Sequence, residues 1–334
     1  MKAIGYRAMG GVEVLTDIEL PRPTPGPRDL LVAVKAVSVN PVDIKRRQWE
    51  SPATAPDFMV LGYDAAGIVE AVGSDVSLFR PGDEVFYAGA RDRPGTNAEF
   101  HLVDERIVGL KPKTLSFAEA AALPLTSITA WEILFDRMRV PYGSKKPCGA
   151  LVVLNGAGGV GSIMIQLAAR LTGLTVIATA SRPETTDWVR KLGASHVADH
   201  RRPLDEAVKA IGFDGIDYLA AITSTPGSVP AIAAAMNPQG HITFIDNFDE
   251  SILPFKAKSI TISWEMMFTR SLFQTKDMDA QHRLLSEVSA LVDAGVLRST
   301  LTKNLGRISA ENLRKAHAAI ESGRVFGKVV LEGF

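Results

Sequence analysis

The 334-residue sequence contains a single cysteine, Cys148, and no excess of either charge. One cysteine excludes an intrachain disulfide and any zinc site built from several thiolates. The 37 basic and 37 acidic side chains cancel, so nothing indicates nucleic acid as a partner. The sequence also lacks an apolar run of about 18 residues and a signal-peptide core. We therefore expect no membrane partner and a cytoplasmic location.

The length of the sequence, and a change in its secondary-structure pattern near residue 126, predict two domains. Residues 1–125 are rich in strand patterns and punctuated by Gly and Pro, which favours a β-rich domain. From residue 126 to about 294, apolar runs alternate with helical patterns, as is typical of a doubly wound parallel sheet and the α/β class. The segment from about 295 to 334 is expected to return to the first domain. The candidate strands are 30–39, 67–72, 151–154, 175–180, 196–198, 218–222, 241–245, 260–264 and 327–331, and a helix is expected over 279–294.

A glycine-rich turn follows the apolar run 151–154 and precedes an apolar helical pattern. Its spacing G-x-G-x-x-G indicates a dinucleotide site, because the first glycine permits the turn and the second lets the backbone approach a pyrophosphate. The third lets the helix pack close to the sheet, and the helix N-terminus attracts the phosphates. The predicted phosphate loop consists of Gly156, Gly158, Gly159, Val160 and Gly161.

The second strand of this predicted sheet lacks the acidic residue that would bind the ribose 2′-hydroxyl of NAD. Ala180 lies where the acid is expected, and Ser181 and Arg182 follow it. A guanidinium can hold a phosphate with paired donors, so the sequence favours NADPH over NADH. Ser181 could instead cap the next helix, with Pro183 as its first residue. Both interpretations can hold together.

Short sequence segments along nearly the whole chain match, in their order and spacing, the characteristic segments of one protein family. They are Asn40–Asp43, Leu61–Val69, Val72–Gly73, Phe79–Val85, Gly95–Phe100, Ala122–Thr126, Gly156–Gly161 and Gly327–Leu331. On these segments the chain resembles the medium-chain dehydrogenase/reductase superfamily, and within it the zinc-free quinone oxidoreductase branch. The resemblance implies a GroES-like partial-barrel domain, a Rossmann domain and an active-site cleft between them.

The chain departs from the zinc-dependent members at their metal-binding positions. Asn40 stands where they carry a ligand Cys, and Tyr63-Asp64 stands where they carry a His-Glu pair. The segment from Tyr87 to Gly95 is short and lacks their four-cysteine lobe. The six histidines are scattered without ligand spacing, so we predict no metal site. The resemblance then implies hydride transfer to an acceptor that is already electrophilic: a quinone, an enone or another activated carbonyl such as an aldehyde.

Three residues of the first domain are the catalytic candidates. Asn40 is expected to face the nicotinamide or the acceptor, although it could simply form the turn before a proline. Asp43 could orient the pocket or cap a helix beginning near Ile44. Tyr63 could donate a hydrogen bond or a proton to the acceptor carbonyl, or line the pocket wall. Asp64 is expected to be a structural partner.

The remaining cofactor candidates come from strand ends and from the C-terminal segment. Thr126 and Thr129 could touch the nicotinamide ribose or amide, or cap a helix or lie in the core. Thr185 stands where some relatives carry a phosphate-binding Lys, which weakens the NADPH prediction. The other candidates are His200 near the adenosine, Ile222, Thr223 and Phe244 along the crevice, and Phe326 and Lys328 closing over the cofactor. Alternatively, His200 is a loop histidine, and Phe326 and Lys328 belong to an ordinary strand with a surface lysine.

Two further functions fit the same sequence. The first is a zinc-free alcohol or polyol dehydrogenase with a proton relay through Tyr63 and Asp64. The second is an NADPH-binding sensor with little turnover. A homodimer is expected, paired through the segment Ile260–Trp264, and the loops Gln48–Phe58 and Met266–Gln274 should shape the acceptor pocket.

Overall fold

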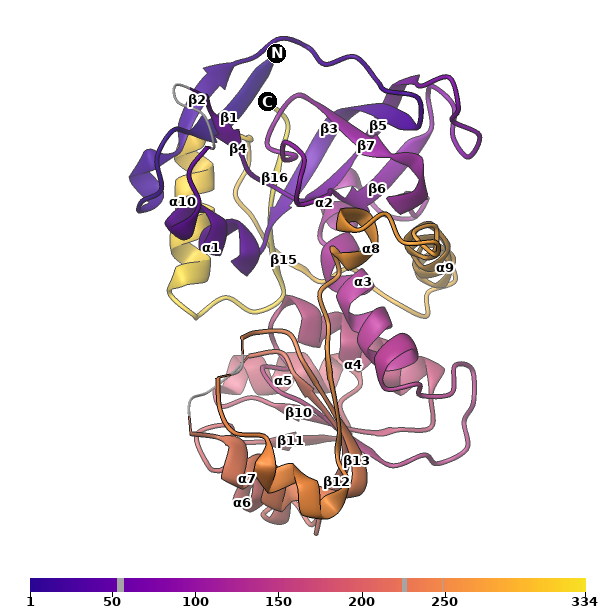
Figure 1. The fold of residues 1–334 in the computed structure, drawn as a ribbon, viewed down its shortest axis with the longest axis vertical. Helices are drawn as coiled ribbons and strands as arrows, with labels where there is room; N and C mark the ends of the chain where they lie inside the picture. Colours follow the sequence, from indigo (N-terminus) through magenta and orange to yellow (C-terminus); the bar gives the residue numbers. More distant parts are fainter. Residues whose placement is uncertain (53–56, 224–226, 248) are drawn as a thin grey trace. The chain divides into compact units, whose positions relative to one another are not determined.

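The computed structural model describes residues 1–52, 57–223, 227–247 and 249–334, and the chain forms two compact units (Figure 1). The first unit comprises Met1–Ile128 and Phe268–Phe334, and the second comprises Thr129–Met267. The chain thus returns to the first unit well before the expected residue 295. The cause is the helix at 280–293, which packs on the first unit, where His282 Nδ1 lies 2.6 Å from the carbonyl oxygen of Val108.

The first unit is built on a long, bent strand. β3 pairs antiparallel with β5, β7 and β16, and the sheet order is β15-β16-β3-β5-β6-β8. The C-terminal strand β16 confirms the segment predicted at 327–331. The strands of this unit are β1 (Lys2–Tyr6), β2 (Thr16–Glu19), β3 (Asp29–Val39), β4 (Met59–Val60), β5 (Asp64–Val72), β6 (Glu84–Ala88), β7 (Phe100–Asp104), β8 (Val108–Leu110), β15 (Leu301–Asn304) and β16 (Lys328–Glu332).

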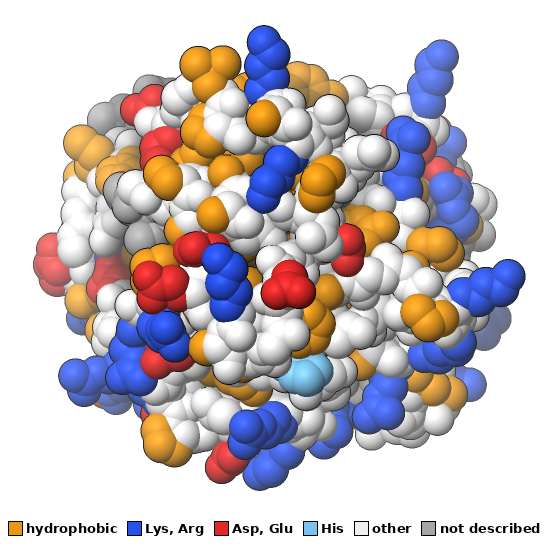
Figure 2. Space-filling view, turned by 90° about the horizontal axis from the view of Figure 1, so that it is seen from below, with side chains coloured by type: hydrophobic (Ala, Val, Ile, Leu, Met, Phe, Trp, Pro, Cys, Tyr) orange, Lys and Arg blue, Asp and Glu red, His pale blue; other side chains and the backbone are white. Residues whose placement is uncertain are grey.

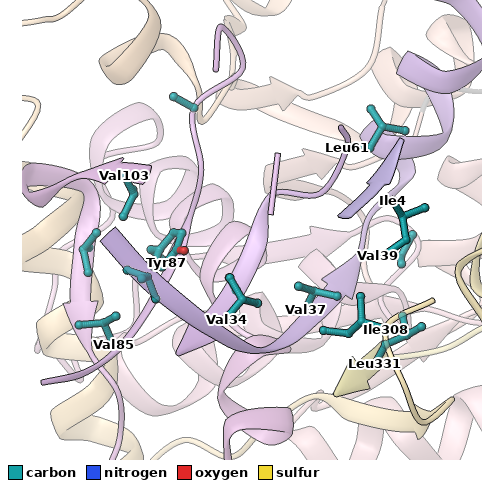
Figure 3. Close-up of a cluster of buried hydrophobic side chains, with 14 of the residues drawn as sticks. Ile4, Val34, Val37, Val39, Leu61, Val85, Tyr87, Val103, Ile308 and Leu331 are labelled. Carbon is teal, nitrogen blue, oxygen red and sulfur yellow. The ribbon is translucent and has the colours of Figure 1, made fainter. Parts of the chain in front are cut away.

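A register shift in β3 decides which of its side chains reach the core. Leu30, Val32 and Val34 are core residues, but beyond a bulge near Val34 the core positions become Val37 and Val39. One extra residue moves the alternation by one place, so both halves of the strand bury a face. Figure 3 shows Val34, Val37 and Val39 in one cluster with side chains from β6, β7 and β16.

Helices complete the first unit, and a buried arginine joins two of them. Arg47 on α1 is fully buried; its Nη1 lies 3.2 Å from His317 Nδ1, and its Nη2 donates to Glu321, both on α10. A buried guanidinium must be paired in this way because desolvation of a lone charge is very costly. The helices are α1 (Pro41–Trp49), α2 (Phe117–Ala121), α3 (Pro124–Trp131), α8 (Thr269–Leu272), α9 (Ala280–Asp293) and α10 (Ala310–Glu321).

The second unit is the predicted doubly wound domain. Its sheet is parallel in the order β11-β10-β9-β12-β13-β14, so the chain winds outward from β9 in one direction and from β12 in the other. Open α/β sheets bind ligands at such a reversal, beyond the carboxyl ends of the strands. The elements are β9 (Ala150–Val153), α4 (Gly159–Leu171), β10 (Thr175–Thr179), α5 (Pro183–Leu192), β11 (His196–Ala198), α6 (Leu204–Lys209), β12 (Ile216–Ala221), α7 (Val229–Ala235), β13 (Met236–Phe244) and β14 (Thr261–Trp264).

Charged and apolar side chains are mixed on the surface. Lys, Arg, Asp and Glu all appear on the face drawn in Figure 2, with apolar atoms between them. Among the described residues, no helix is both long enough and apolar enough to cross a membrane.

Candidate functional site

The glycine loop joins β9 to α4, as the sequence predicts. The left-handed residue of the turn is Asn155, with φ of +52°, and not Gly156. Asparagine tolerates this conformation better than most residues. The backbone N–H of Asn155 donates to Thr179 Oγ1 at 2.9 Å, and that of Gly156 donates to the Thr179 carbonyl oxygen at 3.1 Å. The turn is thereby fastened to the end of the neighbouring strand β10.

Each of the three spaced glycines makes room for a different neighbour. A Cβ on Gly156 would lie 2.8 Å from the Ala178 Cβ, and one on Gly158 would lie 2.9 Å from Asn155 Nδ2. A Cβ on Gly161 would lie 2.6 Å from the carbonyl oxygens of Asn155 and Gly156. Gly161 therefore lets α4 approach the turn backbone, and not the sheet as predicted. The resulting tight turn before the N-terminus of a 13-residue helix fits a pyrophosphate.

Two residues that the sequence analysis missed hold the loop in place. Ser162, in the first turn of α4, donates its hydroxyl to the Ala157 carbonyl oxygen at 3.2 Å. Trp188 on α5 donates its indole N–H to Ser162 Oγ at 2.8 Å. No local motif marks this chain of hydrogen bonds, because Trp188 follows Ser162 by 26 residues.

The residues expected to hold a 2′-phosphate follow β10. Ser181 and Arg182 are half-buried, and Arg182 Nε lies 3.3 Å from Glu184 Oε1. Arg182, and not Ser181, is the N-cap residue of α5, with Pro183 at the first helical position. Thr185 Oγ1 accepts from Arg182 N at 3.3 Å, so this buried threonine has a capping role where relatives were expected to carry a lysine.

The other strand-end candidates differ in exposure. His200 is exposed in a turn after β11. Ile222 and Thr223 directly follow β12 and are half-buried and exposed, respectively. Phe244 ends β13 but is only 2% exposed within the core of the second unit. The ring of Phe244 packs within this core, and a role for the residue along the crevice stays a prediction.

In the first unit, a buried polar cluster lies where the family carries its metal ligands. Asp64 Oδ2 accepts from Ser38 Oγ at 2.7 Å, Asn40 Nδ2 at 2.8 Å and Lys328 Nζ at 3.1 Å. Asp64 Oδ1 accepts from the Leu125 backbone N–H at 2.7 Å. Each of these donors offsets part of the cost of burying the carboxylate. We call Ser38, Asn40, Asp43, Asp64 and Lys328 the lysine cluster.

Lys328 enters this cluster from the C-terminal strand. Its ammonium also donates to Asn40 Oδ1 and, at 3.1 Å, to the Val39 carbonyl oxygen. Lys328 is 3% exposed, so the interpretation as a surface lysine is wrong. The Asn40 amide donates to one charged partner and accepts from the other, which leaves it committed within the cluster. Its contact with a nicotinamide or an acceptor stays a prediction.

Asp43 caps the helix that Asn40 precedes. Its Oδ2 accepts from Asn40 N at 2.8 Å and its Oδ1 from Gly62 N at 3.1 Å. The capping interpretation is thus confirmed, although α1 begins at Pro41 and not near Ile44. Burial raises the pKa of Asp43 to about 7, and the neighbouring Asp64 adds to this while the two N–H donors and Lys328 oppose it.

Tyr63 lies beside the cluster and is held by an arginine. Arg46 Nη1 donates to the Tyr63 hydroxyl oxygen at 2.7 Å, and the tyrosine ring packs on Phe268 with centroids 4.6 Å apart. The ring is 1% exposed, but its bond to Arg46 is only partly buried. Burial raises the pKa of Tyr63 to about 12, while Arg46 works in the opposite direction. The phenol therefore keeps its proton at neutral pH.

The last three candidates have local roles in the structure. Thr126 is buried on α3, where its hydroxyl donates to the Leu123 carbonyl oxygen at 3.0 Å. Thr129 is buried on the same helix. Phe326 is half-buried just before β16, and its carbonyl oxygen accepts from Thr302 Oγ1. Of the two expected pocket loops, Gln48–Phe58 contains residues 53–56, which lie outside the described part of the chain.

Known proteins match both units. The alcohol dehydrogenase GroES-like domain model matches residues 26–130, and the zinc-binding dehydrogenase model matches residues 192–331. A zinc-type alcohol dehydrogenase-like protein of Staphylococcus aureus is 42% identical, with 99% of each chain covered. The crystal structure of a proposed zinc-dependent alcohol dehydrogenase from Rhizobium etli has a TM-score of 0.95 at 57% identity, covering 100% of this chain and 98% of that one.

More distant relatives have names that specify an acceptor. The NADPH-dependent alkenal/one oxidoreductase of Arabidopsis thaliana is 38% identical over 72% of this chain and 64% of its own. The quinone oxidoreductase of Coxiella burnetii has a TM-score of 0.83 at 26% identity, covering 100% of this chain and 99% of that one. The GroES-like unit and the dinucleotide-type sheet together define a two-domain oxidoreductase. The chain belongs to the medium-chain dehydrogenase/reductase superfamily.

Proposed function

We propose that the protein is a zinc-independent, NADPH-dependent reductase that transfers hydride to activated alkenes, quinones or other activated carbonyl compounds. The observation that carries this proposal is the lysine cluster, in which the ammonium of Lys328 lies 3.1 Å from Asp64 Oδ2. A cation is thus already built into the chain where zinc-dependent members of the superfamily bind their metal.

The donor set does not fit zinc. Zinc prefers thiolate, imidazole and carboxylate ligands in a tetrahedral arrangement. Here the matching side chains are the amide of Asn40, the phenol of Tyr63 and the carboxylate of Asp64. That carboxylate is already bound to Lys328, whose ammonium would repel a dication. The only cysteine, Cys148, lies in the second unit. Among the residues that the structure describes, no three His, Cys, Asp or Glu side chains form a group that could hold a metal ion.

The cofactor site fits a phosphorylated dinucleotide. The loop from Gly156 to Gly161 would hold the pyrophosphate, because its glycines leave no Cβ in the way. Arg182 and Ser181 would hold the 2′-phosphate, since Ala180 stands where an NAD site would carry an acidic residue. The Arabidopsis relative named for NADPH supports this assignment. Bound NADPH would supply the hydride.

The acceptor class follows from what the chain can and cannot supply. Without a metal to lower the pKa of a bound hydroxyl, alcohol oxidation lacks its main electrostatic aid. Reduction of an electrophilic acceptor needs only position and a hydrogen bond to the developing oxyanion. Tyr63 would donate that bond, because its phenol is protonated and its O–H has no acceptor among the described residues. The names of the alkenal/one and quinone oxidoreductases point to the same acceptors.

A homodimer paired through β14 belongs to the same proposal. β14 is the outermost strand of the described sheet, and Trp264 at its end is 53% exposed. An uncovered edge strand can pair with a second copy of itself. A cytoplasmic location stays a prediction.

Steady-state assays test the proposed reaction directly. The purified protein should oxidise NADPH with enones, 9,10-phenanthrenequinone or benzoquinones, and NADH should serve less well. Oxidation of simple alcohols would favour the alternative relay through Tyr63 and Asp64. These two residues make separate hydrogen bonds in the structure, to Arg46 and within the lysine cluster. Tight NADPH binding without turnover of any acceptor would overturn the proposal in favour of a sensor.

A further inference from the structure

Arg46 makes the one hydrogen bond that the hydroxyl of Tyr63 has in the described part of the chain. Its Nη1 donates to the phenol oxygen at 2.7 Å and to the Arg91 carbonyl oxygen at 3.1 Å. Its Nε donates to Glu50 Oε2 at 2.7 Å, four residues further on at the C-cap of α1. The side chain of Arg46 is 13% exposed. The guanidinium is therefore fixed at three points, and its plane is set by the helix that carries it.

This geometry determines where the phenol proton of Tyr63 can go. The hydroxyl oxygen accepts from Arg46, so its own O–H must be directed toward another acceptor. None of the described residues provides that acceptor. The packing of the ring on Phe268 holds the phenol oxygen in place, while the hydroxyl hydrogen can still rotate about the C–O bond. The O–H is thus left for an acceptor oxygen that the described residues do not supply.

Arg46 also compensates the charge that proton donation would leave behind. A buried tyrosine is a poor acid because burial disfavours the tyrosinate. A guanidinium 2.7 Å from the oxygen favours the tyrosinate, and Arg46 cannot itself be deprotonated. The Tyr63–Arg46 pair can therefore give up a proton and recover it without a metal ion.

From this arrangement, and resting on the proposed function, we infer that Arg46 is a positioning residue that makes Tyr63 the proton donor to the acceptor oxygen. When hydride from the nicotinamide forms a bond to the β-carbon of an enone, the π-electron pair moves to the carbonyl oxygen. That oxygen takes the proton of Tyr63, which gives an enol and a tyrosinate paired with Arg46. Water then returns a proton to the tyrosinate, and the enol tautomerises to the saturated ketone in solvent.

A double-mutant cycle on Tyr63 and Arg46 tests this role. Tyr63→Phe should lower kcat for an enone by about 100-fold and Arg46→Met by about 10-fold. In the Tyr63→Phe background, Arg46→Met should have less than about a twofold further effect, because its target is gone. Arg46→Lys should recover part of the activity by restoring a positive charge.

The matched control is Arg91→Met. Arg91 also donates to Glu50 at 2.7 Å, but it has no hydrogen bond from its side chain to the phenol of Tyr63. This variant removes a neighbouring guanidinium from the same ion-pair group and should lower kcat far less than Arg46→Met does, because Arg91 acts on Tyr63 only through its charge. NADPH binding, measured by quenching of tryptophan fluorescence, should be the same in every variant. The solvent deuterium isotope effect on kcat should rise in Arg46→Met, because proton transfer becomes slower relative to the other steps.

The possible outcomes separate this inference from the proposed function. If the unmodified protein reduces no enone or quinone, the proposed function fails. If it does so and Tyr63→Phe and Arg46→Met have multiplicative effects, Arg46 acts independently of Tyr63 and the inference is overturned. Equal losses in Arg91→Met and Arg46→Met, with an unchanged isotope effect, would also overturn it, because a merely structural role predicts that result.

Discussion

The two units each bury two acidic side chains beside one basic side chain, but they treat the charges differently. In the first unit, Lys328 donates to Asp64 and acts on Asp43 only through its charge, and every carboxylate oxygen accepts a hydrogen bond. In the second, Glu132 and Glu265 share Arg137, whose Nε lies 2.8 Å from Glu265 Oε2.

The difference lies in the supply of N–H donors. Backbone N–H groups of Asn40, Gly62 and Leu125 bind the aspartates, whereas the two glutamates hydrogen-bond to each other. Burial first, and then the neighbouring Glu132, raises the pKa of Glu265 to about 9, against about 7 for Asp43. Donors thus decide whether a buried acid group can stay ionised or must hold a proton.

The largest effect is expected when the buried positive charge of the first unit is removed. Lys328→Met would leave two buried carboxylates without their cation, and should lower the free energy of unfolding by about 3–5 kcal/mol. Urea unfolding followed by circular dichroism measures this loss. Adding Asp64→Asn to the Lys328→Met variant should recover part of the lost free energy of unfolding, since a buried amide needs no cation.

Lys258→Met is the matched control. The Lys258 ammonium donates to carbonyl oxygens at the end of α7, at 2.7 Å for Ala233 and Met236, and has no acidic partner among its described bonds. Its loss should cost only about 1 kcal/mol. Equal losses in the two variants would mean that the charge of Lys328 is not what holds the lysine cluster together.

The second prediction concerns the shared proton of the second unit. The pKa of Glu265 is raised from 4.5 to about 9 in the folded protein, so its stabilising contribution is complete below about pH 4.5 and is lost as pH rises toward 9. Glu265→Gln imitates the protonated acid at every pH. It should leave stability unchanged near pH 4.5 and raise it by roughly 1–3 kcal/mol near pH 8.

Thermal unfolding across this pH range, compared with the unmodified protein, measures the effect of Glu265→Gln. A constant difference between the two proteins from pH 4.5 to pH 9 would show that Glu265 does not hold a proton. The aspartates of the first unit would then no longer be distinguished from this pair.

The third prediction moves from buried charges to a half-exposed one. Arg182→Ala should raise the KM for NADPH by about tenfold, because one charge-assisted phosphate contact contributes about 1.4 kcal/mol. The KM for NADH should not change, since NADH lacks the 2′-phosphate. If both cofactors respond equally, Arg182 serves only as the N-cap residue of α5.

The sequence was enough to predict those features of the fold that depend on residues close together in the chain. The strand run 151–154, the glycine spacing and the helical pattern after it were read correctly because each is set by local periodicity. The left-handed Asn155 was missed, although asparagine in a turn is a known signal for this conformation.

Contacts between distant residues could not be predicted in the same way. Lys328 and Asp64 are 264 positions apart, and the antiparallel pairing of β3 with both β16 and β5 brings them together. Trp188 and Arg46 act through single hydrogen bonds that leave no periodic signal. The expected return of the chain at about 295 failed for a related reason, because the amphipathic helix at 280–293 does not reveal which unit it covers.

The account depends most on the claim that Lys328 supplies the positive charge of the cluster and that no metal is needed. The direct test is elemental analysis of the freshly purified protein together with enone reduction before and after dialysis against a chelator. We expect zinc far below one equivalent per chain and unchanged turnover. One equivalent of zinc, with turnover lost on chelation and restored by added zinc, would contradict the claim.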